Sequence, residues 1–408
     1  MAQVLPFRAL RSAKDKVAEV SAPPYDVMNS LEAAAKIAVN PSSLLRVTKA
    51  EAEHPNVDPY APEIYKCAAD RLQAMVEAEL LFEEAQPAYY IYRLTKGAHR
   101  QTGIAAAYSA AEYRGNKIKK HELTRPDKEN DRAMHIRITR AQTGPVFLAY
   151  RAEAKLDDLV AGFTCRIPEY DFVAEDGVRH TMWVVDAPED CSNIKTAFAN
   201  IPDLYIADGH HRSAAAVLLA GQQPENAAAQ VFLAVAFPHD QLAIMDYNRV
   251  VKDLNGLTKA EFMAAVAENF RVSNIGKGSD VSGKPQTRHV FGMYIDNEWY
   301  VLRANSDIVD ENDCQARLDV NILQRNILQP LLAIDDPRTA KRIDFVGGIR
   351  GMSELEKLVD SGDYAVAFSL FPPSMDELLA IADNNEIMPP KSTWFEPKLR
   401  DGMVINRI

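Results

Sequence analysis

The sequence of 408 residues lacks a long hydrophobic run and an excess of basic residues. No stretch reaches the roughly 20 apolar residues that a membrane-spanning helix requires, and residues 1–8 contain no apolar signal-peptide core. Lys and Arg number 46 against 57 Asp and Glu, so the net charge of -11 argues against binding DNA over a broad surface. We therefore expect a soluble, cytoplasmic protein without a membrane segment, whose partners are small molecules rather than nucleic acid. Nothing in the sequence indicates its oligomeric state.

Paired cysteines and complete versions of two common motifs are also missing. The four cysteines are far apart and include no Cys-x-x-Cys pair: Cys67, Cys165, Cys191 and Cys314. This spacing excludes a zinc knuckle and a dense disulfide framework. His121-Glu122-Leu123-Thr124-Arg125 lacks the histidine at the fifth position of the zinc-protease motif, and residues 276–285 lack the spacing of a Walker loop. We interpret 276–285 as a flexible surface connection.

Helix and strand patterns alternate along the chain, which predicts a mixed α/β (α+β) fold. Residues 62–84 have the apolar spacing of a long amphipathic helix, and 88–94 with 102–110 alternate as paired strands do. The segment from Leu44 to Val47 can begin another strand.

The length of the chain allows two or three domains. We expect an N-terminal α/β region at 1–150 that contributes His121–Arg125, and a core at 151–275 that contains Asp208–Arg212. A C-terminal α/β region at 286–408 would end in a docked tail that carries Lys391–Thr393, because the neighbouring Trp394 and Phe395 need burial.

The most informative segment is Leu204-Tyr205-Ile206-Ala207-Asp208-Gly209-His210-His211-Arg212-Ser213, followed by an apolar run at 214–220. It predicts a buried strand, a tight polar turn and a helix that stops near Gly221. The start of such a helix presents backbone N–H groups and the positive end of the helix dipole, which together bind phosphate well. A phosphate-handling enzyme is therefore the first hypothesis.

Each residue of the predicted turn has a chemical and a structural interpretation. Asp208 either caps the helix or binds Mg²⁺, and Gly209 permits a positive φ and a close approach of phosphate. His210 and His211 point in different directions, so at most one of them faces the ligand directly. The planar fork of Arg212 suits phosphate oxygens, although a solvated ion pair is the ordinary role of a single Arg.

A second group of polar residues precedes another predicted helix. Glu122 is the candidate general base, with His121 as its orienting partner or as an additional phosphate contact. Thr124 and Arg125 could bind substrate or phosphate at the helix start. The simpler interpretation of the following helix is ion pairing along one face of a charged surface helix: Asp131, Arg132 and His135.

Two proline-rich segments carry further candidates. Pro23-Pro24 forces a rigid path that holds Tyr25 and Asp26 in either a purely structural turn or a substrate-binding loop. Lys391-Ser392-Thr393 follows two prolines near the C-terminus, so its donors could be fixed in a phosphate-binding pocket. A lysine there could neutralise a transferring phosphoryl group.

Four motifs together carry a family resemblance: Asp-Gly-His-His-Arg at 208–212, Pro-Pro-Tyr-Asp at 23–26, Lys-His-Glu-Leu-Thr-Arg-Pro at 120–126 and Pro-Lys-Ser-Thr at 390–393. The chain resembles a bacterial and archaeal family catalogued as domain of unknown function 1015. The Asp-Gly-His-His-Arg element alone is similar to the nucleotide-binding element of the ParB/sulfiredoxin superfamily, which includes archaeal ADP-dependent free serine kinases.

This resemblance implies a ParB/sulfiredoxin-like α/β core with additional α/β segments. It also implies that Gly209–Arg212 contact phosphates and that Asp208 lies near Mg²⁺ or a substrate hydroxyl. The chain departs from the small serine kinases in its length and in the large segments on both sides of the motif, so the choice of Glu122 as base rests on chemistry alone.

The leading hypothesis is a Mg²⁺-dependent phosphotransferase that uses a nucleotide (ATP or ADP) or pyrophosphate and acts on a small hydroxyl compound, with free L-serine as the best guess. Glu122 would be the base, and His211, Arg212 and Lys391 would stabilise charge. The alternative is a nucleotide-binding regulatory or partition-type (ParB-like) protein without kinase activity, although no helix-turn-helix with a basic stripe is visible. A third interpretation makes His121, His210 and His211 transition-metal ligands in a hydrolase.

Overall fold

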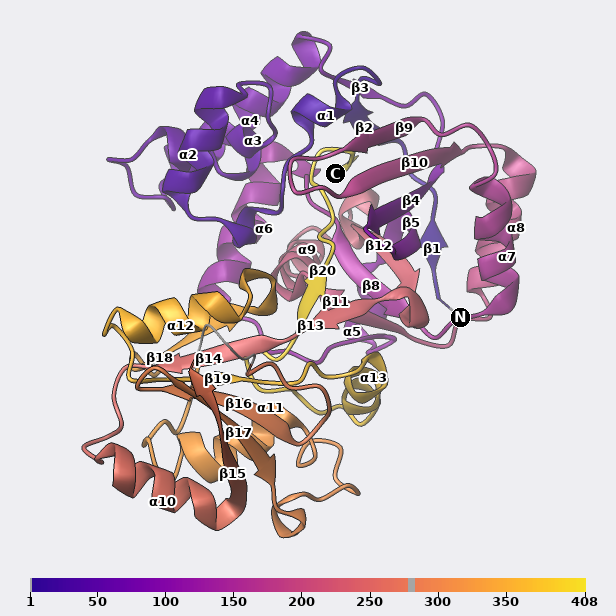
Figure 1. The fold of residues 1–408 in the computed structure, drawn as a ribbon. Coiled ribbons are helices and arrows are strands. Elements are labelled where there is room, and N and C mark those ends of the chain that lie inside the picture. Colours follow the sequence, from indigo (N-terminus) through magenta and orange to yellow (C-terminus); the bar gives the residue numbers. More distant parts are fainter. Residues whose placement is uncertain (1, 278–282) are drawn as a thin grey trace. The chain divides into compact units, whose positions relative to one another are not determined.

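The computed structural model describes residues 2–277 and 283–408 and divides into two compact units. The first unit holds the chain up to Leu242 together with Pro397–Ile408, and the second is Ala243–Glu396 (Figure 1). This division differs from the expected three regions, because a single sheet continues across the expected boundary at residue 150. Residues 278–282 of the expected surface connection lie outside the described residues.

A nine-stranded mixed sheet forms the centre of the first unit. Its order is β6 (Ile118–Lys119), β11 (Leu204–Asp208), β8 (Val146–Tyr150), β12 (Val231–Pro238), β5 (His99–Ser109), β4 (Tyr89–Lys96), β10 (Arg179–Val185) and β9 (Tyr170–Val173), with β1 (Val4–Leu5) paired to β5. The pairs β6/β11 and β8/β12 are parallel, and the other pairs are antiparallel. The mixed α/β class and the predicted β4/β5 pair are therefore confirmed.

A smaller sheet in the first unit pairs strands from the early part of the chain with the strand from its C-terminal segment. Its order is β3 (Leu81–Glu83), β2 (Ala9–Ser12), β21 (Val404–Arg407) and β7 (Ala141–Gln142). Leu10 and Ile405 of this sheet are fully buried in a cluster with apolar residues of α2 (Ser30–Val39) and α4 (Pro62–Glu77). The last strand of the chain is thus an inner strand of the first unit.

The parallel pair β6/β11 determines where the polar motifs lie. Leu204 and Tyr205 of β11 pair with Ile118 and Lys119 of β6, so both strands end at the same edge of the sheet. After β11 the chain turns directly into α9 (His210–Gln222), as the sequence predicted. Helix α9 packs against α6 (Pro126–Thr139), which follows the β6 segment. Two motifs that lie far apart in the sequence therefore meet at this edge.

The second unit is built on a six-stranded antiparallel sheet. Its order is β15 (Phe270–Lys277), β17 (Glu298–Ala304), β16 (Val290–Ile295), β19 (Val366–Ser369), β14 (Tyr247–Val251) and β18 (Ile343–Gly347). The helices of this unit include α10 (Lys259–Asn269), α11 (Asp319–Leu323), α12 (Met352–Asp360) and α13 (Met375–Asp383). Leu355 of α12 packs with Trp299 of β17 in its core. A separate ribbon pairs β13 (Ala243–Met245) with β20 (Trp394–Glu396).

Two sequence predictions are corrected by the local structure. The segment 44–47 is not a strand: Leu45–Thr48 form the short helix α3, since so short a segment of mostly apolar residues fits a buried helix as well as a strand. The helix predicted at 62–84 ends at Glu77 as α4. Glu79 then adopts a positive φ of 55°, which reverses the chain into β3.

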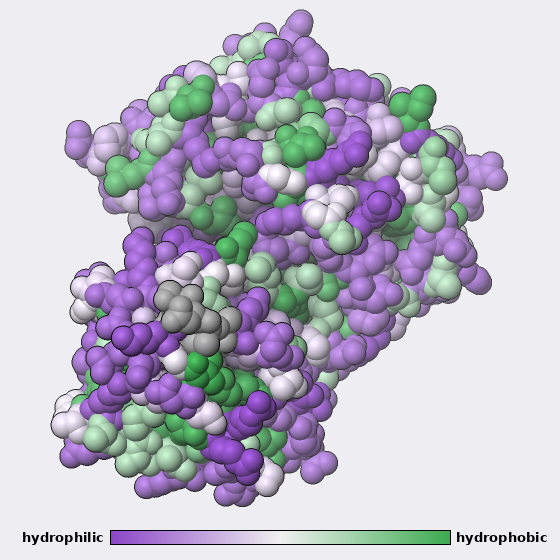
Figure 2. All heavy atoms as spheres, in the orientation of Figure 1, coloured by the Kyte–Doolittle hydropathy of each residue, from purple (hydrophilic) through white to green (hydrophobic). Residues whose placement is uncertain are grey.

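The visible surface is mainly polar. Figure 2 shows hydrophilic side chains over most of this face, with hydrophobic side chains in scattered groups. In the ranges 2–277 and 283–408, every helix is too short or too polar to cross a bilayer.

Close packing in the central sheet predicts a stability effect at Gly103 of β5. A Cβ added there would lie 2.7 Å from the Ala236 carbonyl oxygen and from a ring carbon of Phe237, both in β12. We expect Gly103→Ala to lower the free energy of unfolding by about 1–3 kcal/mol through overpacking. Chemical denaturation followed by circular dichroism measures the effect.

The same substitution at Gly162 is the matched control. Gly162 lies in α7 (Ala154–Phe163), and an added Cβ there meets no described atom within 4 Å. Gly162→Ala should be neutral or stabilise the protein by up to about 1 kcal/mol. Equal denaturation midpoints for the two variants would contradict the packing argument.

Candidate functional site

The turn between β11 and α9 has the geometry of an anion-binding helix start. Gly209 is the N-cap residue with a φ of 90°, and a Cβ there would lie 3.3 Å from Arg212 Nε. Only glycine adopts this conformation without strain. The N-cap residue itself has no side chain that could cap α9, and the choice between a capping role and Mg²⁺ binding for Asp208 stays a prediction. The first turn of the helix instead faces the polar groups described next.

Arg212 lies almost entirely inside the first unit, with 9% of its surface exposed. Its Nη1 donates a hydrogen bond to the Pro145 carbonyl at 2.5 Å, and its Nη2 lies 3.6 Å from Asp26 Oδ2 and 3.7 Å from Asp208 Oδ2. Burial alone would lower the pKa of Arg212, but the two carboxylates outweigh it and raise the pKa. The guanidinium is thus a fixed buried cation rather than a solvated one.

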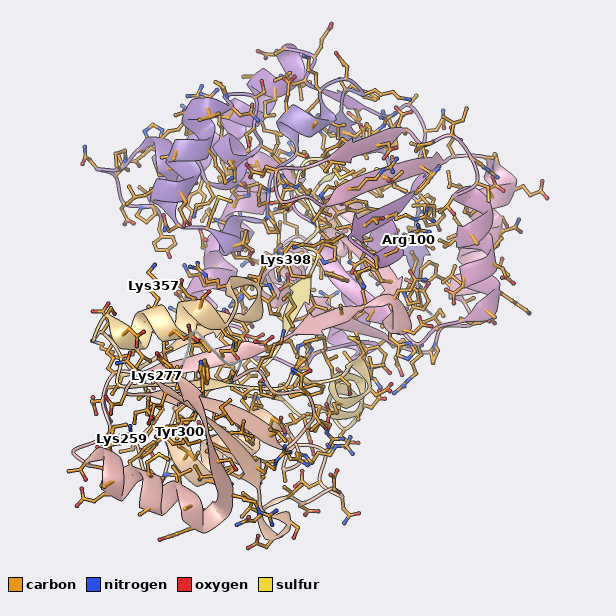
Figure 3. All side chains as sticks on the ribbon, viewed as in Figure 1. Arg100, Lys259, Lys277, Tyr300, Lys357 and Lys398 are labelled. Atoms are coloured by element: carbon orange, nitrogen blue, oxygen red, sulfur yellow. The ribbon has the colours of Figure 1, made fainter. Side chains whose placement is uncertain are left out.

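A second cation comes from the C-terminal segment. Lys398, labelled in Figure 3, places its Nζ 3.1 Å from Asp208 Oδ2. Burial would raise the pKa of Asp208, but Lys398 and then Arg212 hold it well below its usual range. Asp208 is therefore ionised, and it orients both cations at the end of β11.

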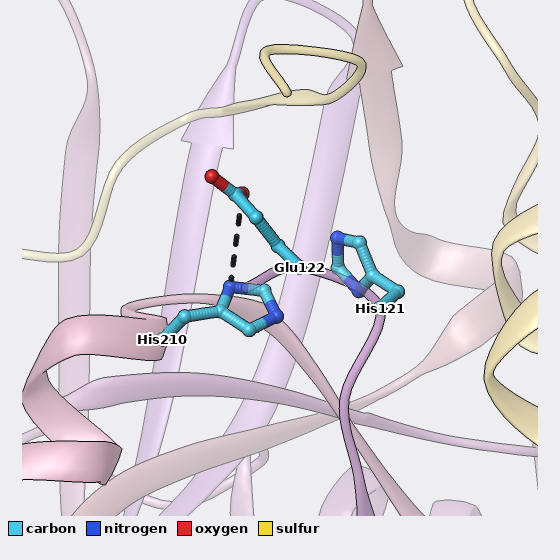
Figure 4. Close-up of side chains that lie close together, drawn as sticks. All are labelled: His121, Glu122 and His210. Atoms are coloured by element: carbon cyan, nitrogen blue, oxygen red, sulfur yellow. Dashed lines mark ion pairs between the residues drawn. The ribbon is translucent and has the colours of Figure 1, made fainter. Parts of the chain in front are cut away.

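His121, Glu122 and His210 converge beside the same turn (Figure 4). The rings of His121 and His210 meet edge to face with centroids 4.5 Å apart, and His210 Nδ1 lies 4.0 Å from Glu122 Oε2. Burial lowers the pKa of His121 to about 4, and the nearby Ile206 backbone only partly offsets it. Burial and then His121 lower the pKa of His210. Both imidazoles are therefore neutral at pH 7.

The remaining residues of the second motif link the two segments. The backbone N–H of Arg125 donates to His211 Nε2 at 3.2 Å. The Arg125 side chain pairs with Asp127 at 2.8 Å, and the Thr124 hydroxyl donates to Glu129. The two predicted motifs therefore lie side by side, although the contacts of Thr124 and Arg125 also serve the start of α6.

Tyr25 and Asp26 lie in the short 3₁₀ helix η1 (Tyr25–Val27). Asp26 reaches Arg212, and the Arg132 guanidinium lies over the Tyr25 ring at 4.2 Å. The predicted solvent-exposed face of α6 is instead buried: Asp131 accepts from the Tyr65 hydroxyl at 2.9 Å, and His135 Nε2 lies 2.9 Å from the Val47 carbonyl oxygen. Helix α4 and the segment before it cover this face, which explains the difference.

A cavity of about 40 Å³ lies behind Arg212, with room for roughly two or three water molecules. Its lining includes Tyr25, Arg132, Arg212 and Asp401. Asp401 Oδ1 and Arg212 Nε have no hydrogen-bond partner among the described residues. Burial raises the pKa of Asp401 to about 7, although Arg212 acts in the opposite direction.

The third predicted segment lies in the second unit. Lys391 has a φ of 56°, and its Nζ lies 5.7 Å from the centre of the Tyr247 ring. The Ser392 hydroxyl donates to the Pro389 carbonyl at 2.6 Å. A phosphate-binding role for Lys391, Ser392 and Thr393 stays a prediction.

Sequence reasoning missed Lys398 and Asp401, both of which belong to the first unit. Lys398-Leu399-Arg400-Asp401 has no distinctive spacing, and the tail motif at 391–393 attracted the assignment instead. The one available signal is the apolar run Met403–Ile405 directly afterwards, which indicates that a buried strand follows these charges.

Comparison with solved structures finds matches of low overall similarity. A conserved hypothetical protein from Pyrococcus furiosus shares 13% identity, with 74% of this chain and 94% of that chain covered and a TM-score of 0.36. A free serine kinase in complex with AMP shares 12% identity, with 71% and 86% covered and a TM-score of 0.36. SbnI with C-terminal truncation from Staphylococcus aureus shares 12% identity, with 74% and 86% covered and a TM-score of 0.37. The ParB/sulfiredoxin-like core stays a prediction.

A search of curated protein sequences finds no match to this chain. A family model described as protein of unknown function (DUF1015) matches residues 4–321. This span contains the motifs at 23–26, 120–126 and 208–212 and covers more than half of the chain. The chain therefore belongs to the DUF1015 family, as its motifs indicated.

Proposed function

We propose that this protein is a Mg²⁺-dependent phosphotransferase that acts on a small hydroxyl compound. One observation carries the proposal: two cations, Arg212 and Lys398, share the carboxylate of Asp208 at the open start of α9, where Glu122 also lies close to His210. Phosphoryl transfer depends mainly on positioning and on stabilising negative charge. This edge of the sheet supplies both.

In this proposal the donor phosphates lie at the N-terminus of α9. Backbone N–H groups of Gly209 to Arg212 and the helix dipole favour an anion there. Arg212 Nε, which has no partner among the described residues, and Lys398 supply fixed positive charge that is stronger in a buried site than in water. His210 and His211 flank the phosphates, with His211 held by Arg125.

The donor set also fits a Mg²⁺ ion that a nucleotide brings with it. Mg²⁺ usually binds one or two protein carboxylates together with substrate phosphates and water. Asp208 is ionised and is the carboxylate nearest the helix start, so it is the proposed protein ligand. Its pairs with Lys398 and Arg212 leave it one further oxygen, Oδ1. The ion would neutralise phosphate charge during transfer.

Glu122 is the proposed general base. Its side chain is 33% exposed, so a substrate hydroxyl can reach it, and neutral His210 lies 4.0 Å away. Glu122 would accept the hydroxyl proton while the hydroxyl oxygen bonds to the transferred phosphorus. The bond from that phosphorus to the nucleotide or pyrophosphate leaving group then breaks, and Arg212 with Lys398 would stabilise the charge of the leaving group.

Free L-serine remains the proposed acceptor, with ATP, ADP or pyrophosphate as donor. The resemblance of Asp208–Arg212 to the nucleotide-binding element of free serine kinases supports this choice. Tyr25 and Asp26, fixed beside Arg212 and Arg132, are proposed to contact the acceptor, as are His121, Thr124 and Arg125. These assignments place substrate binding on the loops that surround the start of α9.

A direct assay tests the activity. Purified protein with L-serine, Mg²⁺ and ATP, ADP or pyrophosphate should yield O-phosphoserine, detected by mass spectrometry. Glu122→Gln should lower kcat by about 100-fold or more because the base is lost. No phosphoserine with any of the three donors would contradict the serine version. Nucleotide binding without transfer would favour the regulatory alternative.

Lysine substitutions test whether Lys398 or Lys391 supplies positive charge to the donor phosphates. Lys398→Met should lower kcat/KM by about 100-fold, since it removes a fixed cation beside Asp208. Lys155→Met, on the exposed face of α7, is the matched surface control and should leave kcat/KM unchanged. Lys391→Met tests the original tail prediction in the same assay. Equal kcat/KM for Lys398→Met and the control would remove Lys398 from the site.

Asp401 predicts a pH dependence of nucleotide affinity. Because burial raises its pKa to about 7, Asp401 is neutral at pH 6 and charged at pH 8, where it would partly cancel Arg212 and repel phosphate. The ratio of the nucleotide Kd of the wild type to that of Asp401→Asn should be near one at pH 6 and rise to about three or more at pH 8. Isothermal titration calorimetry at both pH values measures the ratio. A ratio that does not change with pH would contradict this role.

A further inference from the structure

Three potential ligands of a transition metal meet at one edge of the first unit. His121 and Glu122 follow β6, and His210 begins α9 directly after β11. Because β6 and β11 are parallel neighbours, the segments after them leave the sheet side by side. One ligand atom from each residue lies within 4.8 Å of the other two (Figure 4). The sheet topology, not sequence spacing, brings this set together.

The two histidines lack the partners that buried polar groups normally have. His121 is 1% exposed and His210 is 6% exposed. Both ring nitrogens of His121 and Nε2 of His210 have no hydrogen-bond partner among the described residues. Buried polar nitrogens without partners are rare and call for an unseen water or ion. Imidazole nitrogens without hydrogen-bond partners are groups that a metal ion can use as ligands.

The chemistry of the set selects the class of ion. Two imidazoles and one carboxylate are a common ligand set for zinc, whereas Mg²⁺ and Ca²⁺ prefer oxygen ligands alone. Zinc lies about 2.1 Å from such ligands, which places tetrahedral ligand atoms about 3.4 Å apart, so each of the three groups needs to move inward by up to about 0.8 Å. Glu122 is 33% exposed, which gives it room to move and leaves a path for the ion.

We infer that His121, Glu122 and His210 form a binding site for Zn²⁺ or a similar divalent transition-metal ion. His211 does not belong to it, because its Nε2 accepts the backbone N–H of Arg125. The site is separate from the nucleotide's Mg²⁺ at Asp208 and does not rest on phosphotransfer. When Zn²⁺ is bound, Glu122 is a ligand and is not available as a base, so zinc would inhibit the proposed transfer.

Zinc binding is measured without nucleotide or substrate. Full-length protein is stripped with a chelator and titrated with Zn²⁺ against a chromophoric competitor, and bound zinc is counted by elemental analysis. We expect about one Zn²⁺ per chain, and Co²⁺ in its place should give visible absorption bands of a nitrogen and oxygen ligand set. Less than a tenth of an equivalent of bound zinc would overturn the inference, whatever the phosphotransfer assay shows.

Variants assign the ligands. His210→Asn and His121→Asn should each weaken zinc binding by about 100-fold or more, and Glu122→Gln by about tenfold. His211→Asn is the matched control on the neighbouring residue and should bind zinc as wild type does. Circular dichroism checks folding; if a buried-histidine variant fails to fold, the partly exposed Glu122→Gln decides, through its affinity and its Co²⁺ spectrum. Unchanged zinc affinity and spectrum in Glu122→Gln, or an equal loss in His211→Asn, would overturn the assignment.

Discussion

The buried guanidinium of Arg212 lies near acidic residues from three separate segments of the first unit. A cation that is 9% exposed is costly unless carboxylates surround it, and Arg212 meets this demand through Asp26, Asp208 and the Asp401 carboxyl behind it. These three acidic residues come from the N-terminal loop, the end of β11 and the C-terminal segment. The same contacts that make Arg212 tolerable in the interior also fix its fork at the start of α9. Folding and the proposed anion binding therefore depend on the same group of charges.

Two chemical environments lie next to each other at this helix start. On one side, Arg212, Lys398 and Asp208 are charged and hold one another in place. On the other side, His121 and His210 are neutral because burial opposes their protonation. Environments that push neighbouring titratable groups in opposite directions are typical of functional sites. Glu122 lies at the boundary, which is why it has both a proposed catalytic role and a proposed ligand role.

Local patterns in the sequence predicted the elements that local physics determines. The β11 strand, the turn at Gly209 and helix α9 follow from apolar runs and a glycine within a few residues, and the β4/β5 pair follows from alternation. The segment 44–47 was assigned wrongly because three apolar residues around one arginine do not distinguish a strand from a helix. Lys398 and Asp401 were missed for a different reason. Their neighbours in space are far away in the sequence, so only the folded first unit shows which residues they approach.

The return of the chain to its first unit has a consequence for synthesis on the ribosome. Pro397–Ile408 is translated after the whole of the second unit, yet it supplies β21 between β2 and β7 and the ammonium group beside Asp208. During translation, β2 and β7 of the first unit therefore lack the strand that lies between them until the whole of Ala243–Glu396 has been made. A product that terminates before Pro397 retains nearly all of the residues of both units but has neither the inner strand nor Lys398. The positive charge beside Asp208 is thus completed only after the second unit has been translated.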